Sequence, residues 1–239
     1  MSQAGPRGAD SRSFADDRQR LRVRVRGLYA VTPEGLPDAL LLQRCALVLA
    51  HGARLLQWRD KSQDGARRLV IARSLARFCR SHDALFIVND DLALARAVHA
   101  DGVHLGADDG DLAAARAALP NALIGASCYA DLERARAAVA QGADYIAFGS
   151  VFASPTKPQA VRAPLDLFAQ ARAFCVPTVA IGGITRANCA EVRAAGAHAC
   201  AVISDLFGDA QTTADEVSAR ARTFRSLLEP AAPSISSSH

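Results

Sequence analysis

Charged residues of both signs follow short apolar runs at several places in this chain. Of the 28 lysines and arginines, only Lys61 and Lys157 are lysines, so a compact ammonium group stands at two positions in a sequence that otherwise uses guanidinium groups. With Arg59 they could neutralise phosphate oxygens and stabilise a departing pyrophosphate. Asp90 and Asp109 could supply the one or two carboxylates that Mg²⁺ typically takes. The combination predicts a metal-bound diphosphate site.

These residues can act together only if the fold gathers them, and the hydrophobic pattern predicts such a fold. Short apolar runs alternate eight times with Ala-, Arg- and Leu-rich stretches of helical period. Uniformly apolar strands separated by single helices are typical of a parallel sheet covered on its outside, and eight units predict closure into a single (β/α)8 TIM barrel, an α/β fold. The predicted strands are 27–32, 55–60, 84–90, 102–106, 123–128, 145–149, 178–183 and 199–204. The predicted helices are 38–51, 64–81, 91–99, 111–119, 131–140, 164–174, 188–195 and 213–228.

Active sites of such barrels lie at the C-terminal ends of the strands, so the residues that close each predicted strand are the site candidates. Most of them are polar. In strand order they are Gln57, Arg59 and Lys61; Asn89 and Asp90; Asp108, Asp109 and Asp111; Ser127; Ser150, Ser154, Thr156 and Lys157; Gly182 and Gly183; and Ser204. For Asp108 and Asp111, a solvated turn and a helix N-cap are the favoured interpretation.

A second anion site is predicted after the seventh and eighth strands. Loops at this place frequently bind a phosphate in barrels, and Gly182 and Gly183 would let a ligand approach the backbone closely, with Ser204 beside them. The segment 154–157 adds two hydroxyls and an ammonium, although loop polarity alone explains these equally well. Four neighbours of the candidates have apolar settings that favour packing over chemistry: Trp58, His104, Cys128 and Tyr129.

Composition narrows the class of protein further. The chain has 239 residues, half of them hydrophobic, which suits one barrel domain over 26–228. The polar N-terminus and the absence of an apolar stretch of about 20 residues predict a cytoplasmic protein without a membrane segment. A mild net charge of +4 does not imply nucleic acid, and six scattered cysteines predict free thiols. The polar ends, 1–25 and 229–239, are expected to lack fixed structure.

Seven motifs in order now show a family resemblance. They are QWRDK (57–61), VNDD (88–91), DGVHLGADD (101–109), GASC (125–128), GADYIAFGSVFASPTK (142–157), AIGGI (180–184) and AVIS (201–204). Throughout residues 27–228 the chain resembles the thiamine phosphate synthase family. AIGGI alone would be shared with many phosphate-binding barrels, whereas the whole series is specific.

The resemblance implies a role for each matching position. A pyrimidine diphosphate would be held by Gln57, Arg59, Lys61, Asn89, Ser127 and Lys157, of which Arg59, Lys61, Ser127 and Lys157 form the predicted catalytic set. Asp90 and Asp109 would be the Mg²⁺ ligands. Ser154 and Thr156 match the loop that meets a thiazole phosphate, and Gly183, Ile203 and Ser204 match the phosphate-cradling positions. Trp58, Asp60 and Pro155 lie inside these motifs and complete the predicted binding set.

The resemblance also implies a dissociative reaction. Pyrophosphate would leave the aminopyrimidine methylene, and the thiazole nitrogen would capture the resulting cation. The residue inventory agrees, since it shows no obvious pair of nucleophile and base for covalent catalysis. Ala107 stands where the family usually shows Gln, and Ser154 stands where Thr is common; neither change removes a charge or a hydroxyl that this chemistry needs.

Three other interpretations compete with this one. A thiazole tautomerase of the same barrel family would carry a histidine where this chain has Tyr129. A non-catalytic sensor of thiamine precursors would have no need to keep the cations and carboxylates together. A phosphosugar isomerase or aldolase would share AIGGI and little else. The sequence leaves open the oligomeric state, a homo-oligomer included, and the choice between a thiazole phosphate and its carboxylated form.

Overall fold

Eight parallel strands form a closed barrel in the computed structural model, which describes residues 10–106, 110–153 and 162–229. Each strand pairs with the next along the chain, and the eighth pairs with the first. The strands are β1 (Gly27–Val31), β2 (Ala53–Trp58), β3 (Leu85–Asn89), β4 (Gly102–Leu105), β5 (Leu123–Tyr129), β6 (Tyr145–Phe148), β7 (Thr178–Ile181) and β8 (Ala199–Val202). The predicted (β/α)8 barrel is therefore confirmed.

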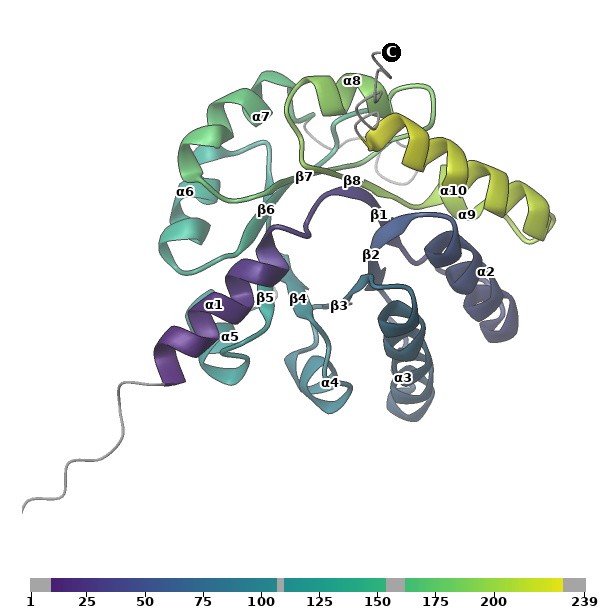
Figure 1. Cartoon of the computed structure of the whole chain (residues 1–239), viewed down its shortest axis with the longest axis horizontal. Coiled ribbons are helices and arrows are strands. Elements are labelled where there is room, and N and C mark those ends of the chain that lie inside the picture. The colour runs from purple at the N-terminus through teal and green to yellow at the C-terminus, as the bar shows by residue number, and fades with distance from the viewer. Residues whose placement is uncertain (1–9, 107–109, 154–161, 230–239) are drawn as a thin grey trace, which may run out of the picture.

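Helices surround this ring of strands on its outside (Figure 1). Several begin at an aspartate whose carboxylate accepts a hydrogen bond from the first turn, as Asp64, Asp91 and Asp131 do. Asp111 does the same for Ala113, which confirms its predicted N-cap role. The helices between the strands and after the last one are α2 (Asp38–Ala50), α3 (Gly65–Ser81), α4 (Leu92–Ala97), α5 (Leu112–Ala118), α6 (Leu132–Ala140), α7 (Asp166–Gln170) with the 3-10 turn η1 (Ala171–Phe174), α8 (Cys189–Ala194), α9 (Ser204–Phe207) and α10 (Ala214–Leu228).

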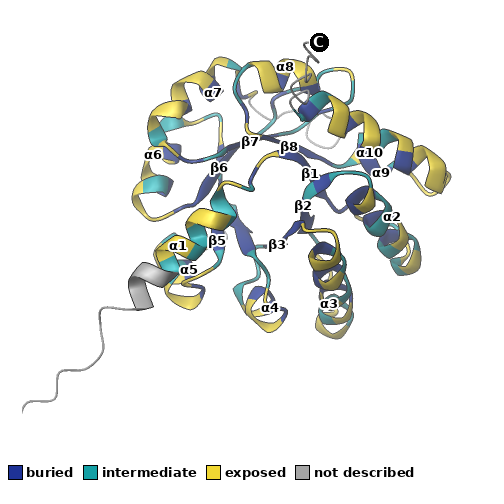
Figure 2. Ribbon diagram, in the orientation of Figure 1, coloured by how far each residue is buried: buried dark blue, intermediate teal, exposed yellow. Residues whose placement is uncertain are grey.

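The strands bury side chains on both of their faces, which explains their uniformly apolar sequences. Inward-pointing residues such as Tyr29, Leu55 and Tyr145 form one core inside the barrel. Outward-pointing residues such as Leu56 and Phe86 form a second, larger core beneath the helices. Figure 2 shows the resulting pattern, with buried strands at the centre and exposed surfaces on the outer sides of the helices.

The N-terminal segment differs from the expectation for residues 1–25, because α1 (Asp10–Arg22) is a helix. Its arginines explain why it is ordered: Arg22 forms an ion pair of 3.3 Å with Asp144, and Arg18 donates a 2.7 Å hydrogen bond to the carbonyl of Pro120. Leu21 packs against the inner core. The expectation of no fixed structure is wrong for this helix, while residues 1–9 and 230–239 lie outside the described part.

Two further details were not predicted. β2 runs from Ala53 to Trp58, two residues earlier than expected, so that Arg59 and Asp60 follow the strand instead of ending it. The short helix α9 directly follows β8 and precedes the last long helix. Within the described residues, no helix has both the length and the apolar character needed to cross a membrane.

Candidate active site

The carboxyl ends of the strands meet at one end of the barrel, which we call the mouth. Most predicted site residues lie there, because the parallel register aligns neighbouring strand ends: Val31 pairs with Gln57, and Asn89 pairs with His104. The described members of the predicted set are Gln57, Trp58, Arg59, Asp60, Lys61, Asn89, Asp90, Ser127, Gly183, Ile203 and Ser204. Asp109, Ser154, Pro155, Thr156 and Lys157 lie outside the described residues.

The end of β2 is fastened to the end of β1 through Thr32. The Thr32 hydroxyl accepts a 2.9 Å hydrogen bond from the backbone N–H of Arg59 and donates one to its carbonyl. The Arg59 side chain forms a 2.5 Å ion pair with Glu34, which is exposed. Since both partners reach solvent, this pair holds Arg59 weakly, and a more highly charged ligand could compete for the guanidinium.

Residues Gln57 and Trp58 point in opposite directions, as successive strand residues must. Gln57 is 4% exposed and donates a 2.9 Å hydrogen bond from Nε2 to the Tyr29 hydroxyl inside the barrel. Trp58 belongs to the outer core beneath the helices, and its Nε1 is buried without a partner among the described residues. The packing interpretation therefore fits Trp58, and we leave its side chain out of the proposed site.

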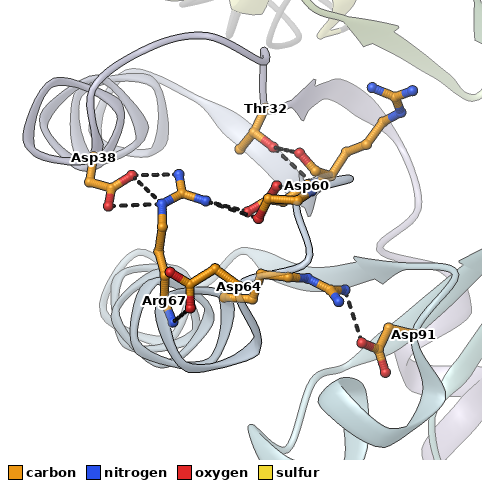
Figure 3. Close-up of polar contacts among 9 residues, drawn as sticks. Thr32, Asp38, Asp60, Asp64, Arg67 and Asp91 are labelled. Atoms are coloured by element: carbon orange, nitrogen blue, oxygen red, sulfur yellow. Dashed lines mark hydrogen bonds and ion pairs between the residues drawn. The ribbon is translucent and has the colours of Figure 1, made fainter.

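Asp60 is held by a clamp that also includes Arg67 and Asp38 (Figure 3). Arg67 on α3 donates to Asp38 at the start of α2 and, at 2.5 Å, to Asp60. Partial burial alone would raise the pKa of Asp60, but hydrogen bonds from Ser62 and Arg67 and the Arg67 charge outweigh it and lower that pKa. Asp60 is thus an anchored carboxylate that holds this stretch of backbone through Ser62 and Arg67.

Lys61 directly follows this anchor and is exposed. No ion pair or hydrogen bond of its ammonium group is found among the described residues. A flexible cation on a fixed stretch of backbone can adapt to the oxygens of a phosphorylated ligand.

The end of β3 turns sharply at Asp90. This residue has a φ of 61°, in the left-handed region that costs a non-glycine residue of order 1–3 kcal/mol. Its backbone N–H donates a 2.9 Å hydrogen bond to the His104 carbonyl of β4, and the Asn89 side-chain amide donates to its carboxylate. These two contacts fix the carboxylate of Asp90 at the edge of the mouth.

Left-handed non-glycine residues recur at the mouth. Besides Asp90, Tyr129 after β5 has a φ of 53° and Ser150 after β6 has a φ of 56°. Such backbone conformations persist where surrounding structure holds them, often at functional sites. Tyr129 was expected to pack, but it is 49% exposed, with the Arg134 guanidinium 5.5 Å from its ring. The packing expectation for Tyr129 is therefore wrong.

Ser127 and Gln57 are linked through residues that sequence reasoning did not place in the site. Ser127 Oγ lies 2.9 Å from His104 Nε2, and His104 Nδ1 lies 3.2 Å from the Tyr145 hydroxyl. The Tyr145 hydroxyl is 3.1 Å from that of Tyr29, which accepts from Gln57. His104 does pack on Tyr145, with ring centroids 5.6 Å apart, but both of its nitrogens also make polar contacts. The signal in the sequence was that Tyr29, His104 and Tyr145 all occupy strand positions whose side chains point into the barrel.

The loops after β7 and β8 form the opposite side of the mouth. A Cβ at Gly183 would lie 2.5 Å from the Ala153 carbonyl oxygen, and one at Gly182 would lie 2.7 Å from the Ser150 backbone. The glycines are thus required for packing against the β6 loop, and they also keep the backbone open. Arg186 and Asp205 join the two loops through a bidentate pair of 2.9 Å bonds, which fixes α9 and its first residue, Ser204.

The metal prediction can be tested in part. Within the described part of the chain, no group of three or more His, Cys, Asp or Glu side chains is arranged so that it could hold a metal ion. Asp90 nevertheless supplies the hard carboxylate oxygens that Mg²⁺ prefers, in an oriented position at the mouth. Because this ion usually needs one or two protein carboxylates, its phosphate-bound form fits the residues present.

Comparisons of the sequence with known proteins identify one family. The family model described as "Thiamine monophosphate synthase" matches residues 28–206. The thiamine-phosphate synthase of Chromobacterium violaceum is 59% identical over 84% of this chain and 97% of its own length. That of Aromatoleum aromaticum is 50% identical over 87% of this chain and 98% of its own. The structure of thiamine phosphate pyrophosphorylase from Pyrococcus furiosus superposes with a TM-score of 0.74 at 36% identity, covering 87% of this chain and 96% of that one.

Proposed function

This chain belongs to the thiamine monophosphate synthase family, and we propose that it joins a hydroxymethylpyrimidine diphosphate to a thiazole phosphate at the mouth of its barrel. The products are thiamine phosphate and pyrophosphate. One observation supports this proposal above the others. The cations Arg59 and Lys61 follow β2 on a clamped backbone, and the oriented carboxylate Asp90 follows the adjacent strand β3.

Each residue of this cluster has a proposed role in holding the diphosphate. Arg59 and Lys61 neutralise its oxygens as negative charge develops on the leaving group. Lys157, in the β6 loop, is proposed to add a third cation. Asn89 orients Asp90 through its amide, while Gln57 and Ser127 offer polar atoms to the pyrimidine substrate.

Asp90 and Asp109 are the carboxylates proposed to hold Mg²⁺. When bound, the ion would neutralise diphosphate charge and so favour its departure. Asp60, in contrast, is committed to Arg67 and is proposed to act by positioning the Arg59–Lys61 segment.

The proposed reaction breaks one C–O bond and forms one C–N bond, and neither step needs a nucleophile from the protein. The methylene C–O bond breaks with its electron pair going to the diphosphate oxygen, and the aminopyrimidine ring delocalises the positive charge left behind. The lone pair of the thiazole nitrogen then forms the new C–N bond. The barrel's contribution is to align the two substrates and to stabilise the leaving group, which are electrostatic and positional effects.

The second substrate is proposed to bind on the β7 and β8 side of the mouth. Gly183, Ile203 and Ser204 would cradle its phosphate, because loops at these strands and a short extra helix such as α9 commonly do so in barrels. Ser154, Pro155 and Thr156 of the β6 loop are proposed to meet the same substrate. The site would accept a thiazole phosphate or its carboxylated form.

The first experiment is an incubation of the purified full chain with both substrates, with and without Mg²⁺, while thiamine phosphate and pyrophosphate are measured. We expect both products in equal amounts, and only when Mg²⁺ is present. Parallel reactions with the plain and the carboxylated thiazole phosphate compare kcat/KM for the two forms. Substrate binding without any product would contradict the proposal and favour a sensor. Metal-independent isomerisation of a thiazole would favour a tautomerase.

A further inference from the structure

Five side chains form a continuous line of hydrogen bonds across the interior of the barrel. It begins at Gln57 on β2, passes through Tyr29 on β1 and Tyr145 on β6, and reaches Ser127 on β5 through His104 on β4. Gln57 and Ser127, at its two ends, are both predicted to contact the pyrimidine substrate. The three residues between them have no role in the proposed chemistry.

The hydrogen-bonded line needs space inside the barrel, and a glycine on β5 provides it. A Cβ at Gly125 would lie 2.1 Å from the Tyr145 ring, so glycine is required there for the ring to cross the barrel. Tyr29 and Tyr145 are each at most 1% exposed. Burial raises the pKa of both phenols well above the ordinary range, so each keeps its proton and can donate one hydrogen bond.

The contact at one end sets the direction of every bond that follows. Gln57 Nε2 donates to the Tyr29 oxygen, so the Tyr29 proton is available for the Tyr145 oxygen. The Tyr145 hydroxyl then donates a hydrogen bond to His104 Nδ1. Since Nδ1 accepts, the imidazole proton is on Nε2. His104 Nε2–H in turn donates to Ser127 Oγ, and the Ser127 proton is left for a ligand.

The hydrogen bonds cannot all run in the reverse direction while Gln57 Nε2 donates to Tyr29. If Ser127 donated to His104 and the chain ran back to Tyr29, the Tyr29 oxygen would accept twice. Its own proton would then have no acceptor among the described residues, and a buried donor without a partner is strongly disfavoured. Reversal therefore requires Gln57 to turn its amide around at the same time.

We propose that Tyr29, Tyr145 and His104 are positioning residues that form a one-way hydrogen-bond relay, which makes Gln57 present a carbonyl oxygen and Ser127 present a hydroxyl proton to the substrate. Among the described residues Gln57 Oε1 makes no side-chain hydrogen bond, so it is the acceptor that remains at this end of the relay. On the proposed function, this polarity suits an aminopyrimidine diphosphate, whose exocyclic amine donates and whose phosphate oxygens accept.

The relay makes a prediction that needs no substrate. In the ligand-free full chain labelled with ¹⁵N-histidine, long-range ¹H–¹⁵N correlation should show His104 with its proton on Nε2 and none on Nδ1. His104→Gln identifies the resonance among the six histidines. Tyr145→Phe removes the donor to Nδ1 and should shift the tautomer balance, whereas Tyr129→Phe, which alters the exposed tyrosine, should not. A proton on Nδ1 in the wild-type protein would overturn the relay.

Kinetics test whether the relay serves the substrate. Tyr29→Phe and Tyr145→Phe should each lower kcat/KM for the pyrimidine diphosphate about tenfold, which corresponds to about 1.4 kcal/mol. The KM of the thiazole phosphate should not change. Because either substitution interrupts the same relay, the double variant should lose about tenfold and not the hundredfold of independent effects. Additive losses, or equal effects on both substrates, would contradict the relay.

The two experiments separate this proposal from the proposed function. A wild-type chain that makes no thiamine phosphate, yet shows the Nε2–H tautomer and its response to Tyr145→Phe, would refute the function and keep the relay. An active enzyme with the proton on Nδ1 would keep the function and refute the relay. Thermal unfolding of each variant shows whether it remains folded at the assay temperature.

Discussion

The two ends of the barrel differ in whether their cations are paired. At the N-terminal end, the Asp144 carboxylate is buried and bonded by Arg116, by Arg22 and by the backbone N–H of Ile124. At the mouth, Lys61 is exposed with no ion pair among the described residues, and Arg59 has an exposed partner. The N-terminal end neutralises this charge internally. The mouth also contains paired carboxylates such as Asp60 and Asp205, but it keeps cations that a ligand can neutralise.

The backbone shows the same division. Before β3, β4 and β7, the left-handed residues Asp83, His99 and Cys175 end a helix and lead into the next strand. At the mouth, Asp90 and Tyr129 adopt this conformation as the chain leaves a strand. Helix ends commonly use a left-handed residue, so the first group is structural, while the second lies at the mouth, where such conformations are often found at functional sites. On the proposed function the chemistry belongs to the mouth, so its cations can be tested separately from the buried charge at the N-terminal end.

Lys61→Ala should produce the largest effect. Loss of this cation should lower kcat/KM for the pyrimidine diphosphate by about 10²- to 10³-fold, because we propose that it stabilises charge on the leaving group. The free energy of unfolding should change by less than about 0.5 kcal/mol, since Lys61 is exposed. Steady-state kinetics and urea unfolding measure the two quantities. Arg73→Ala, which removes an exposed cation from α3, is the control and should leave both unchanged. Near-normal turnover in Lys61→Ala would refute its proposed role.

Asp144→Ala should show the opposite pattern at the other end. Removing this carboxylate, which is 1% exposed, leaves Arg116 without its charged partner and the Ile124 N–H without an acceptor. Breaking a buried pair in this way should lower the free energy of unfolding by about 3 kcal/mol, measured in urea, with kcat unchanged below the transition. Arg18→Ala, which removes a 3.7 Å contact to the same carboxylate, should cost less than about 1 kcal/mol. A large loss of kcat in folded Asp144→Ala would contradict the expectation that charge at the N-terminal end affects stability and not turnover.

Sequence reasoning found the barrel and the location of the site because both depend on local patterns. Apolar strand runs predicted the strands, and the residues that follow them predicted the mouth. It missed α1 because this helix is held by Arg22 pairing with Asp144, which lies 122 residues away. It also missed the polar contacts of His104. A histidine that points into the barrel is expected to pack there, and its partners Tyr145 and Ser127 become evident only in the folded structure. Contacts across the barrel depend on how the barrel closes and on the register between its strands, and the sequence of a single strand specifies neither.

Asp205 offers a smaller test, since it is a mouth-side carboxylate held by an arginine. Partial burial would raise its pKa, but hydrogen bonds from the Arg186 side chain and backbone, with the charges of Arg186 and Arg220, outweigh this and hold the pKa below its ordinary value. A carboxyl whose pKa is lower in the folded state than in the unfolded state stabilises the fold above its unfolded pKa. That stabilisation is lost as the pH falls through the folded pKa.

Asp205→Asn should therefore cost about 1 kcal/mol of unfolding free energy at pH 7, less than Asp144→Ala because this pair is partly exposed to solvent. The difference from wild type should stay constant down to about pH 5 and shrink below about pH 4. Urea unfolding at several pH values measures it, with Asp215→Asn, an exposed aspartate on the first turn of α10, as the control. A difference that grew on acidification would show that the Asp205 pKa is raised. The arginine pairing would then not be what holds the β7 and β8 loops together at the mouth.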